Sequence, residues 1–141
     1  MIDPTAASRP LVVVLAEDEL LIRMAMADVL GDAGFEVIEA EHAEAAVALL
    51  TSRKDEVHLL FTDIHMTGAM DGLQLAHHVS ILWPWIGILI TSGKAHPKPV
   101  EMPPGSRFLS KPYRPEQVMG HLRELADAPQ STRPPPSAGT P

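Results

Sequence analysis

The stretch that decides the fold is VHLLFTDIHMTGAMDG, residues 57–72. It opens with VHLLFT (57–62), an apolar run of the kind found in strands that are buried on both faces of a sheet. Asp63 follows this run directly, and a loop that contains glycine (65–72) comes next. The pattern predicts a buried strand that ends on an acid, followed by a loop and a helix.

Four further segments have strand character. They are LVVVLA (11–16), FEVIEA (35–40), IGILIT (86–91) and RFLS (107–110). Stretches with apolar residues at helical spacing separate them. The aligned residues are Ile22, Ala25 and Val29 in the first stretch, Ala43, Val47 and Leu50 in the second (42–53), Leu75, Val79 and Leu82 in the third, and Val118, Leu122 and Leu125 in the last.

One connection breaks this alternation. The segment between 93 and 106 carries prolines at 97, 99, 103 and 104. An interior proline removes a backbone donor and clashes with the preceding helical turn. We therefore expect the fourth helix to be degenerate.

Strands that alternate with helices indicate a single α/β domain, a doubly wound five-stranded parallel sheet with helices on both faces. This domain is expected to cover residues 11–126. Residues 1–10 form an expected flexible leader, and residues 127–141 form a tail rich in proline that we expect to be disordered.

The composition excludes several classes of function. The formal net charge is −7, and the 11 lysines and arginines form no basic stripe, which argues against DNA as a partner. The chain has no cysteine and therefore no disulfide. Its apolar runs are far shorter than the roughly 20 residues that span a bilayer. We expect a soluble, cytoplasmic protein without membrane contact.

Polar residues gather where the predicted strands end. Glu17, Asp18 and Glu19 follow the first strand, Asp63 the third, Thr91 and Ser92 the fourth, and Lys111 the fifth. Ligands of open α/β sheets bind at the carboxyl ends of the strands. This set therefore predicts a site, with Glu19 assigned to the following helix rather than to the site.

Glu17, Asp18 and Asp63 would repel one another unless a cation were present. Ligands that are all oxygen suit Mg²⁺, which takes one or two carboxylates and keeps room for phosphate oxygens. A carboxylate beside this cation can attack a phosphoryl group and form an aspartyl phosphate. Lys111 and the Thr91 hydroxyl are placed to face the oxygens of the transferring group.

Four segments carry a resemblance to a known family. VLAEDELLIR (14–23), LLFTDIHMTGAMDG (59–72), ILITSG (88–93) and FLSKPY (108–113) resemble the signature blocks of response-regulator receiver domains, in the family's order. The resemblance covers about residues 11–126. It implies a flavodoxin-like sheet with strand order 2-1-3-4-5, a common order among doubly wound sheets.

The resemblance also implies roles for individual residues. Asp63 would be the phosphoacceptor. Glu17 and Asp18 would hold Mg²⁺ together with Asp63, and the backbone carbonyl of His65 would complete the protein ligands. Lys111 would pair with the phosphate, and the Lys111–Pro112 peptide bond would be cis.

Two further positions would report phosphorylation. Thr91 would be the switch hydroxyl that is drawn toward the phosphoryl oxygen, and Phe108 would be the aromatic residue that changes rotamer. The expected consequence is a shift between two states in Thr91, the 93–106 loop and Phe108.

The chain departs from the family pattern in two loops. Thr67 stands where the family usually has proline, and this loop is one residue longer than the commonest form, so loop rigidity and kinase fit are in doubt. The prolines at 97–104 replace much of the usual fourth helix, which puts a standard dimer in doubt. His65 and Gly93 occupy positions that tune dephosphorylation in the family.

The resemblance implies a phosphoacceptor signalling protein rather than an enzyme, one that promotes only its own phosphorylation and dephosphorylation. Its phosphoryl donor would be a sensor histidine kinase or a histidine phosphotransfer protein. Because no effector domain follows residue 126, we expect a stand-alone receiver that acts in a phosphorelay by contacting a downstream protein, as a monomer or weak dimer.

Three alternatives stay open. A phosphatase of the haloacid-dehalogenase type also places a nucleophilic aspartate after a strand, but it needs a second aspartate where this chain has His65. A degenerate receiver could act purely as an interaction module, against which the intact acids, Thr91 and Lys111 argue. The chain could also be a fragment of a longer regulator.

Overall fold

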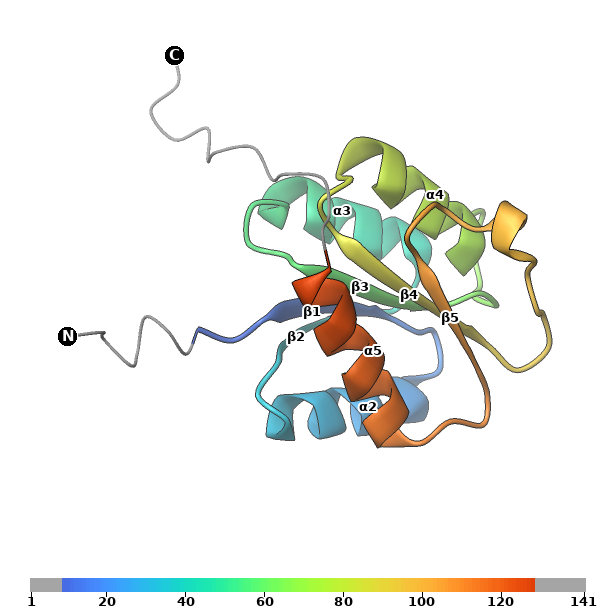
Figure 1. Ribbon diagram of the computed structural model, residues 1–141. Helices are drawn as coiled ribbons and strands as arrows, with labels where there is room; N and C mark the ends of the chain where they lie inside the picture. Colours follow the sequence, from blue (N-terminus) through green and yellow to red (C-terminus); the bar gives the residue numbers. More distant parts are fainter. Residues whose placement is uncertain (1–8, 129–141) are drawn as a thin grey trace, which may run out of the picture.

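The computed structural model describes residues 9–128 (Figure 1). The elements are β1 (Val12–Ala16), α2 (Leu20–Asp32), β2 (Glu36–Ala40), α3 (Ala43–Arg53), β3 (Leu59–Asp63), α4 (Gly72–Leu82), β4 (Gly87–Ser92), the short 3₁₀ helix η1 (Pro99–Glu101), β5 (Arg107–Ser110) and α5 (Pro115–Asp127). The predicted leader (1–10) and tail (127–141) fall almost entirely outside the described residues, so both stay predictions.

The five strands form one parallel sheet in the order β2-β1-β3-β4-β5. This confirms the predicted doubly wound fold and its strand order. The register places Asp63 of β3 opposite Thr91 of β4, and Ser92 opposite Ser110 of β5. Lys111 follows Ser110 directly, so the pairing alone brings three of the predicted site residues to one edge of the sheet.

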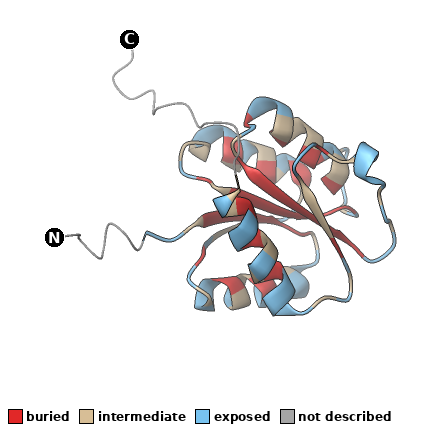
Figure 2. Ribbon diagram, in the orientation of Figure 1, coloured by how far each residue is buried: buried red, intermediate tan, exposed pale blue. Residues whose placement is uncertain are grey.

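Two helical layers cover the sheet. α3 and α4 lie on one face, and α2 and α5 lie on the other (Figure 1). Alternate strand residues point to opposite faces, so Val13 and Phe61 pack toward α2 and α5 whereas Val14 and Leu60 pack toward α3 and α4. The central strands β1, β3 and β4 are buried, whereas the edge strands β2 and β5 are partly exposed, and the outer helix surfaces face solvent (Figure 2). The two cores make the sheet a rigid support for its edge.

The buried face of α2 differs from the prediction. Met26 and Leu30 are its buried residues, whereas Ile22 and Ala25 are exposed and Val29 is only half-buried. The helical spacing was correct but its core-facing stripe was misplaced by one position. Ile22 lies near the start of the helix, beside the carboxyl edge of the sheet, where it lines a pocket rather than the core.

The C-terminal end of α4 also corrects the prediction. Leu82 is exposed, and the next residue, Trp83, is buried instead. The helix ends at Leu82, and Trp83 leaves the helical conformation with φ −135°. Pro84 disfavours a helical conformation for the residue before it. The change of backbone direction turns the indole, rather than Leu82, toward the core on the α4 side.

The connection between β4 and β5 contains no full-length helix, as the prolines predict. Its only helical turn is η1, which begins at Pro99 and has no buried residue. Two other expectations concern the chain's conformation. The Lys111–Pro112 peptide is cis, as expected. Among the described residues, none of the helices combines the length and the apolar character that crossing a bilayer requires.

Candidate functional site

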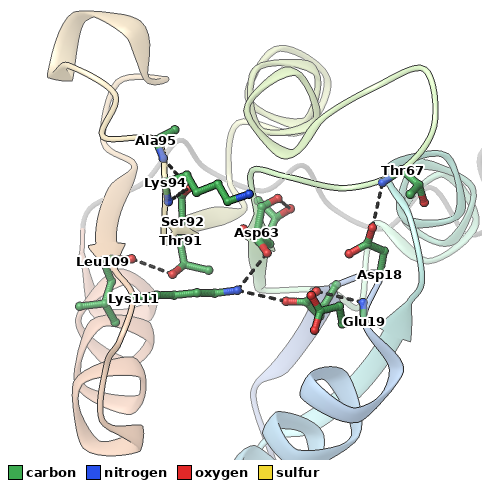
Figure 3. Close-up of polar contacts among 12 residues, drawn as sticks. Asp18, Glu19, Asp63, Thr67, Thr91, Ser92, Lys94, Ala95, Leu109 and Lys111 are labelled. Carbon is green, nitrogen blue, oxygen red and sulfur yellow. Dashed lines mark hydrogen bonds and ion pairs between the residues drawn. The ribbon is translucent and has the colours of Figure 1, made fainter.

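Residues that follow three different strands meet at the carboxyl edge of the sheet (Figure 3). The Lys111 ammonium lies 3.0 Å from Asp63 Oδ2, to which it donates a hydrogen bond, and 3.6 Å from Glu17 Oε1. Asp63 and Glu17 are both buried, with 8% and 4% of their surfaces exposed. The sequence predicted this convergence, because parallel strands end at the same edge of a sheet.

The Glu17 carboxylate is held in an unfavourable environment for a charge. Burial raises the pKa of Glu17, and the nearby charges of Asp63 and Asp18 raise it further. The Glu19 N–H donates to Glu17 Oε2 (3.0 Å), and this bond and Lys111 act in the opposite direction. A buried carboxylate that still has a raised pKa is one that an added cation would stabilise in its charged form.

Lys111 is the cation that the acids already have. Burial alone would lower the pKa of Lys111, but its hydrogen bond to Asp63 and the charges of Asp63 and Glu17 outweigh burial and raise that pKa. The ammonium group therefore stays protonated at neutral pH. One lysine faces two buried carboxylates, so the cluster keeps an excess of negative charge.

The third acid, Asp18, points toward the loop between β3 and α4. The Thr67 N–H donates to Asp18 Oδ2 at 2.9 Å (Figure 3). In this conformation, within residues 9–128, no three His, Cys, Asp or Glu side chains are gathered closely enough to hold a metal ion by themselves. The predicted ligand set therefore stays a prediction.

The donor set nevertheless fits Mg²⁺. Glu17, Asp18 and Asp63 offer only oxygen, and the charges of Asp63 and Asp18 both act on Glu17. Mg²⁺ is usually bound through one or two carboxylates and retains several waters, so a close cage of three side chains is not required. His65 is exposed at the start of the loop, two residues after Asp63. Its carbonyl is the remaining predicted ligand.

The Thr91 hydroxyl is engaged away from Asp63. Thr91 is buried, and its Oγ1 donates to the Leu109 carbonyl of β5 at 2.7 Å (Figure 3). Thr91 lies opposite Asp63 in the sheet, and a change of its χ1 rotamer would turn the hydroxyl away from the Leu109 carbonyl. The structure thus places Thr91 at the site but leaves its switching role a prediction.

Phe108 lies on β5, farther from the edge. It is half-buried against the core on the α3 and α4 side, and its ring meets that of His96 edge to face, with centroids 5.8 Å apart. His96 belongs to the loop between β4 and β5. Phe108 therefore connects this loop to β5, the strand that precedes Lys111, and its predicted change of rotamer stays a prediction.

Several residues at the site were not found from the sequence. A Cβ atom at Gly72 would lie 1.7 Å from the Asp63 carbonyl oxygen, and the Gly72 N–H donates to the Ile64 carbonyl (2.7 Å). Arg23 donates from Nη1 to the Glu17 carbonyl (2.8 Å) and from Nε to Glu39 (3.2 Å). The Asp-Gly pair before a helix was the available signal for Gly72. Arg23 gave none, because its partners depend on how α2 packs.

The start of the loop after β4 adds two more residues. Ser92 is fully buried, and its Oγ accepts hydrogen bonds from the N–H groups of Lys94 (3.2 Å) and Ala95 (2.9 Å). The Lys94 side chain points toward Asp63 (Figure 3). The sequence placed Ser92 at a strand end but did not single out either residue.

The chain matches a known family over most of its length. The sequence model of the response regulator receiver domain matches residues 13–123. A response regulator receiver protein from Sinorhizobium medicae WSM419 has a similar structure, with a TM-score of 0.78 and 28% sequence identity over 84% of this chain and 96% of that one.

Two more distant structures share the fold. The receiver domain protein from Clostridium thermocellum has a TM-score of 0.77 and 18% identity, over 83% of this chain and 94% of that one. The chemotaxis protein CheY4 of Vibrio cholerae has a TM-score of 0.69 and 23% identity, over 82% of this chain and 98% of that one.

The fold and the edge residues define a class, the doubly wound α/β domains that bind ligands where their strands end. Within that class the family match is decisive. The chain belongs to the response-regulator receiver family, whose members are the phosphoacceptor domains of two-component signalling.

Proposed function

We propose that this chain is a receiver that accepts a phosphoryl group on Asp63, in a reaction that depends on Mg²⁺, from a sensor histidine kinase or a histidine phosphotransfer protein. The observation that carries the proposal is the lysine bridge, in which Lys111 contacts both Asp63 (3.0 Å) and Glu17 (3.6 Å). The phosphorylated receiver would act by contacting a downstream protein. We expect the phosphoryl donor and this target in the cytoplasm.

The chemical step is a transfer between two nucleophiles. An Asp63 carboxylate oxygen forms a bond to phosphorus while the bond from phosphorus to the donor's imidazole nitrogen breaks, and the nitrogen keeps the electron pair. The product on this chain is an aspartyl phosphate. Lys111 already contacts Asp63, so its ammonium group is within reach of the oxygens that gain charge.

Glu17, Asp18 and Asp63, with the His65 carbonyl, would hold Mg²⁺, which when bound would neutralise charge on the transferring phosphoryl group. Arg23 supports this arrangement by fixing the Glu17 carbonyl. Glu17 must be ionised to serve, and its raised pKa means that acidification removes this ligand earlier than it would an ordinary glutamate.

The proposed output begins at Thr91. A phosphoryl group on Asp63 would offer the Thr91 hydroxyl a charged acceptor in place of the Leu109 carbonyl. β5 would then lose that bond, and the contact between Phe108 and His96 would pass the change to the 93–106 loop. If the two positions of the Thr91 hydroxyl differ only slightly in free energy, one phosphoryl group is enough to shift the protein from one state to the other.

A docking surface for the phosphoryl donor lies next to the site. The first turns of α2 expose Leu20, Leu21 and Met24 to solvent, with 55%, 79% and 50% of their surfaces accessible. Exposed apolar residues that cluster are typical of protein contacts. A pocket lined by Ile22, Lys111, Pro112 and Tyr113 adjoins them, so a partner on this surface would reach the edge of the sheet.

The test is phosphorylation of the full chain by a small phosphodonor with Mg²⁺, followed by intact mass measurement. Wild type should gain one phosphoryl group, and Asp63→Asn should gain none. Asp32→Asn, at an exposed position at the end of α2, is the matched control and should behave like wild type. Wild type that stays unmodified with Mg²⁺ present would refute the proposal.

A further inference from the structure

The loop between β3 and α4 (64–71) is tied to two other parts of the chain through its backbone. The Thr67 N–H donates to Asp18 Oδ2 (2.9 Å), and the Ala69 N–H donates to Glu44 Oε2 (3.1 Å). Asp18 lies in the turn after β1, whereas Glu44 lies in the first turn of α3. Two carboxylates from separate elements thus hold amides two residues apart.

Gly68, the residue between these amides, fits closely against Glu44. It has φ +113°, a conformation that L side chains rarely adopt. A Cβ atom at this position would lie 2.9 Å from Glu44 Oε1. Glu44 therefore packs against the turn at Gly68 as well as accepting the hydrogen bond of the Ala69 amide. This is the part of the loop in which the sequence departs from the family pattern, with Thr67 in place of proline and one residue more than the commonest form.

We infer that Glu44 is a positioning residue for the metal site, acting through this loop. Glu44 fixes the Ala69 amide, which fixes the turn at Gly68. The turn at Gly68 presents the Thr67 amide to Asp18, and this hydrogen bond sets the direction of the Asp18 carboxylate. A carboxylate that accepts one amide still has a second oxygen available for coordination. The inference rests on the proposed function, because it assumes that Asp18 is a ligand of Mg²⁺.

Among the described residues, the imidazole of His42 also lies near Glu44. His42 Nδ1 lies 3.6 Å from Glu44 Oε1, and the same nitrogen accepts the Ala45 N–H at the start of α3. This contact stays within the helix terminus, whereas the bond to Ala69 crosses to the loop. Groups that orient metal ligands from outside the coordination shell typically change metal affinity 10–100-fold when they are removed.

The experiment measures Mg²⁺ affinity of the full chain by isothermal titration calorimetry. Glu44→Ala should weaken binding about tenfold, at the lower end of that range. Glu44→Gln should stay within about twofold of wild type, because its amide oxygen can accept the same Ala69 N–H. Gly68→Ala should also weaken Mg²⁺ binding, because its Cβ would displace the Glu44 carboxylate. Glu41→Ala removes an equal charge from an exposed neighbour and should change nothing.

Amide hydrogen exchange supplies a second readout without metal. The Thr67 and Ala69 amides should exchange slowly in wild type and in Glu44→Gln, and quickly in Glu44→Ala, with the thermal midpoint showing that each variant is folded. Unchanged Mg²⁺ affinity in Glu44→Ala would overturn the inference, as would an equal loss in the Gln variant, which would indicate long-range charge alone. Wild type that binds no Mg²⁺ would instead remove the proposed function, and this inference with it.

Discussion

Two irregular segments border the site, and they are held in different ways. The β3–α4 loop (64–71) is fixed by atoms that are distant in sequence, namely the carboxylates of Asp18 and Glu44. The β4–β5 segment (93–106) is held mainly by bonds to residues two or three positions away, such as Ser92 with Ala95 and Glu101 with Lys98. Its contacts with distant parts of the chain include those of the His77 and His96 rings, and Ala95 and Met102 pack at the margin of the core.

This difference suits the two segments to different roles: the 64–71 loop can hold site residues in place, whereas the 93–106 segment can change its position. Bonds to distant elements tie a loop to the rigid sheet, so the loop shifts only when that packing is disturbed. Local bonds preserve the shape of a segment while leaving its placement less constrained, as expected of segments with low local stability. The first loop thus suits the metal site, and the second suits the proposed response to phosphorylation.

Gly72 offers the largest test of this contrast. Alanine at this position would place its Cβ 1.7 Å from the Asp63 carbonyl oxygen, which is backbone and has no room to yield. We expect Gly72→Ala to lower the free energy of unfolding by about 3 kcal/mol or more, in the range that marks a severe local defect. Urea unfolding followed by circular dichroism measures the loss.

The control for Gly72→Ala is the same change at Gly120. That glycine lies inside α5 with nothing within 4 Å of an added Cβ. Alanine is the better helix former by about 1 kcal/mol, so Gly120→Ala should stabilise the protein. Opposite signs for the two substitutions are the expected result. A mild effect at Gly72 would mean that the loop can yield, which would remove the contrast between the segments.

These contacts mark the limit of what the sequence could predict. The strand ends at Asp63, Thr91 and Lys111 were predictable, because a parallel sheet brings successive strand ends to one edge whatever the loops do. The bond between Glu44 and Ala69 was not, because it depends on how the start of α3 lies against a loop 25 positions away. Periodicity reports which residues repeat, but not how one element is placed on another.

The helix faces show the same limit on a smaller scale. Spacing identified the helices but not which residues would be buried in α2, since Met26 and Ile22 are related by one helical turn and only packing separates them. At the end of α4, burial passed from Leu82 to Trp83 because the backbone left the helix there. By contrast, all three predicted residues of α5 are buried, and the sheet meets that helix along its full apolar stripe.

Ser92 tests the second segment at its starting point. Its fully buried hydroxyl oxygen is the acceptor for the Lys94 and Ala95 amides. Ser92→Ala leaves both amides without this acceptor, and we expect a loss of about 1–2 kcal/mol in the free energy of unfolding. Ser52→Ala, on the exposed surface of α3, should fall within about 0.5 kcal/mol of wild type.

Hydrogen exchange sharpens the Ser92 result. If local bonds govern the β4–β5 segment, its amides should exchange faster in Ser92→Ala while those of Thr67 and Ala69 keep their wild-type rates. Faster exchange in both loops would show that the two segments are coupled and would contradict the division between them.

The smallest effects come from two bonds of the same type. Asp71 Oδ1 accepts the Gln74 N–H (2.8 Å) at the start of α4, and Glu101 Oε1 accepts the Lys98 N–H (2.7 Å) at η1. Asp71→Ala should cost about 1 kcal/mol, because it removes the N-cap of a helix that packs on the core. Glu101→Ala should cost only about 0.3 kcal/mol, because η1 is short and has no buried residue whose packing the bond could support.

The pair is informative because the two bonds have nearly equal lengths. The difference in the free energy lost on substitution therefore measures how firmly each helix packs on the core, rather than the strength of the bond. Urea unfolding of both variants, with Asp71→Asn as the variant that keeps an accepting oxygen, separates the two contributions. If Glu101→Ala costs as much as Asp71→Ala, then η1 is coupled to the folded core, and the 93–106 segment is not the weakly constrained element that the proposed switch requires.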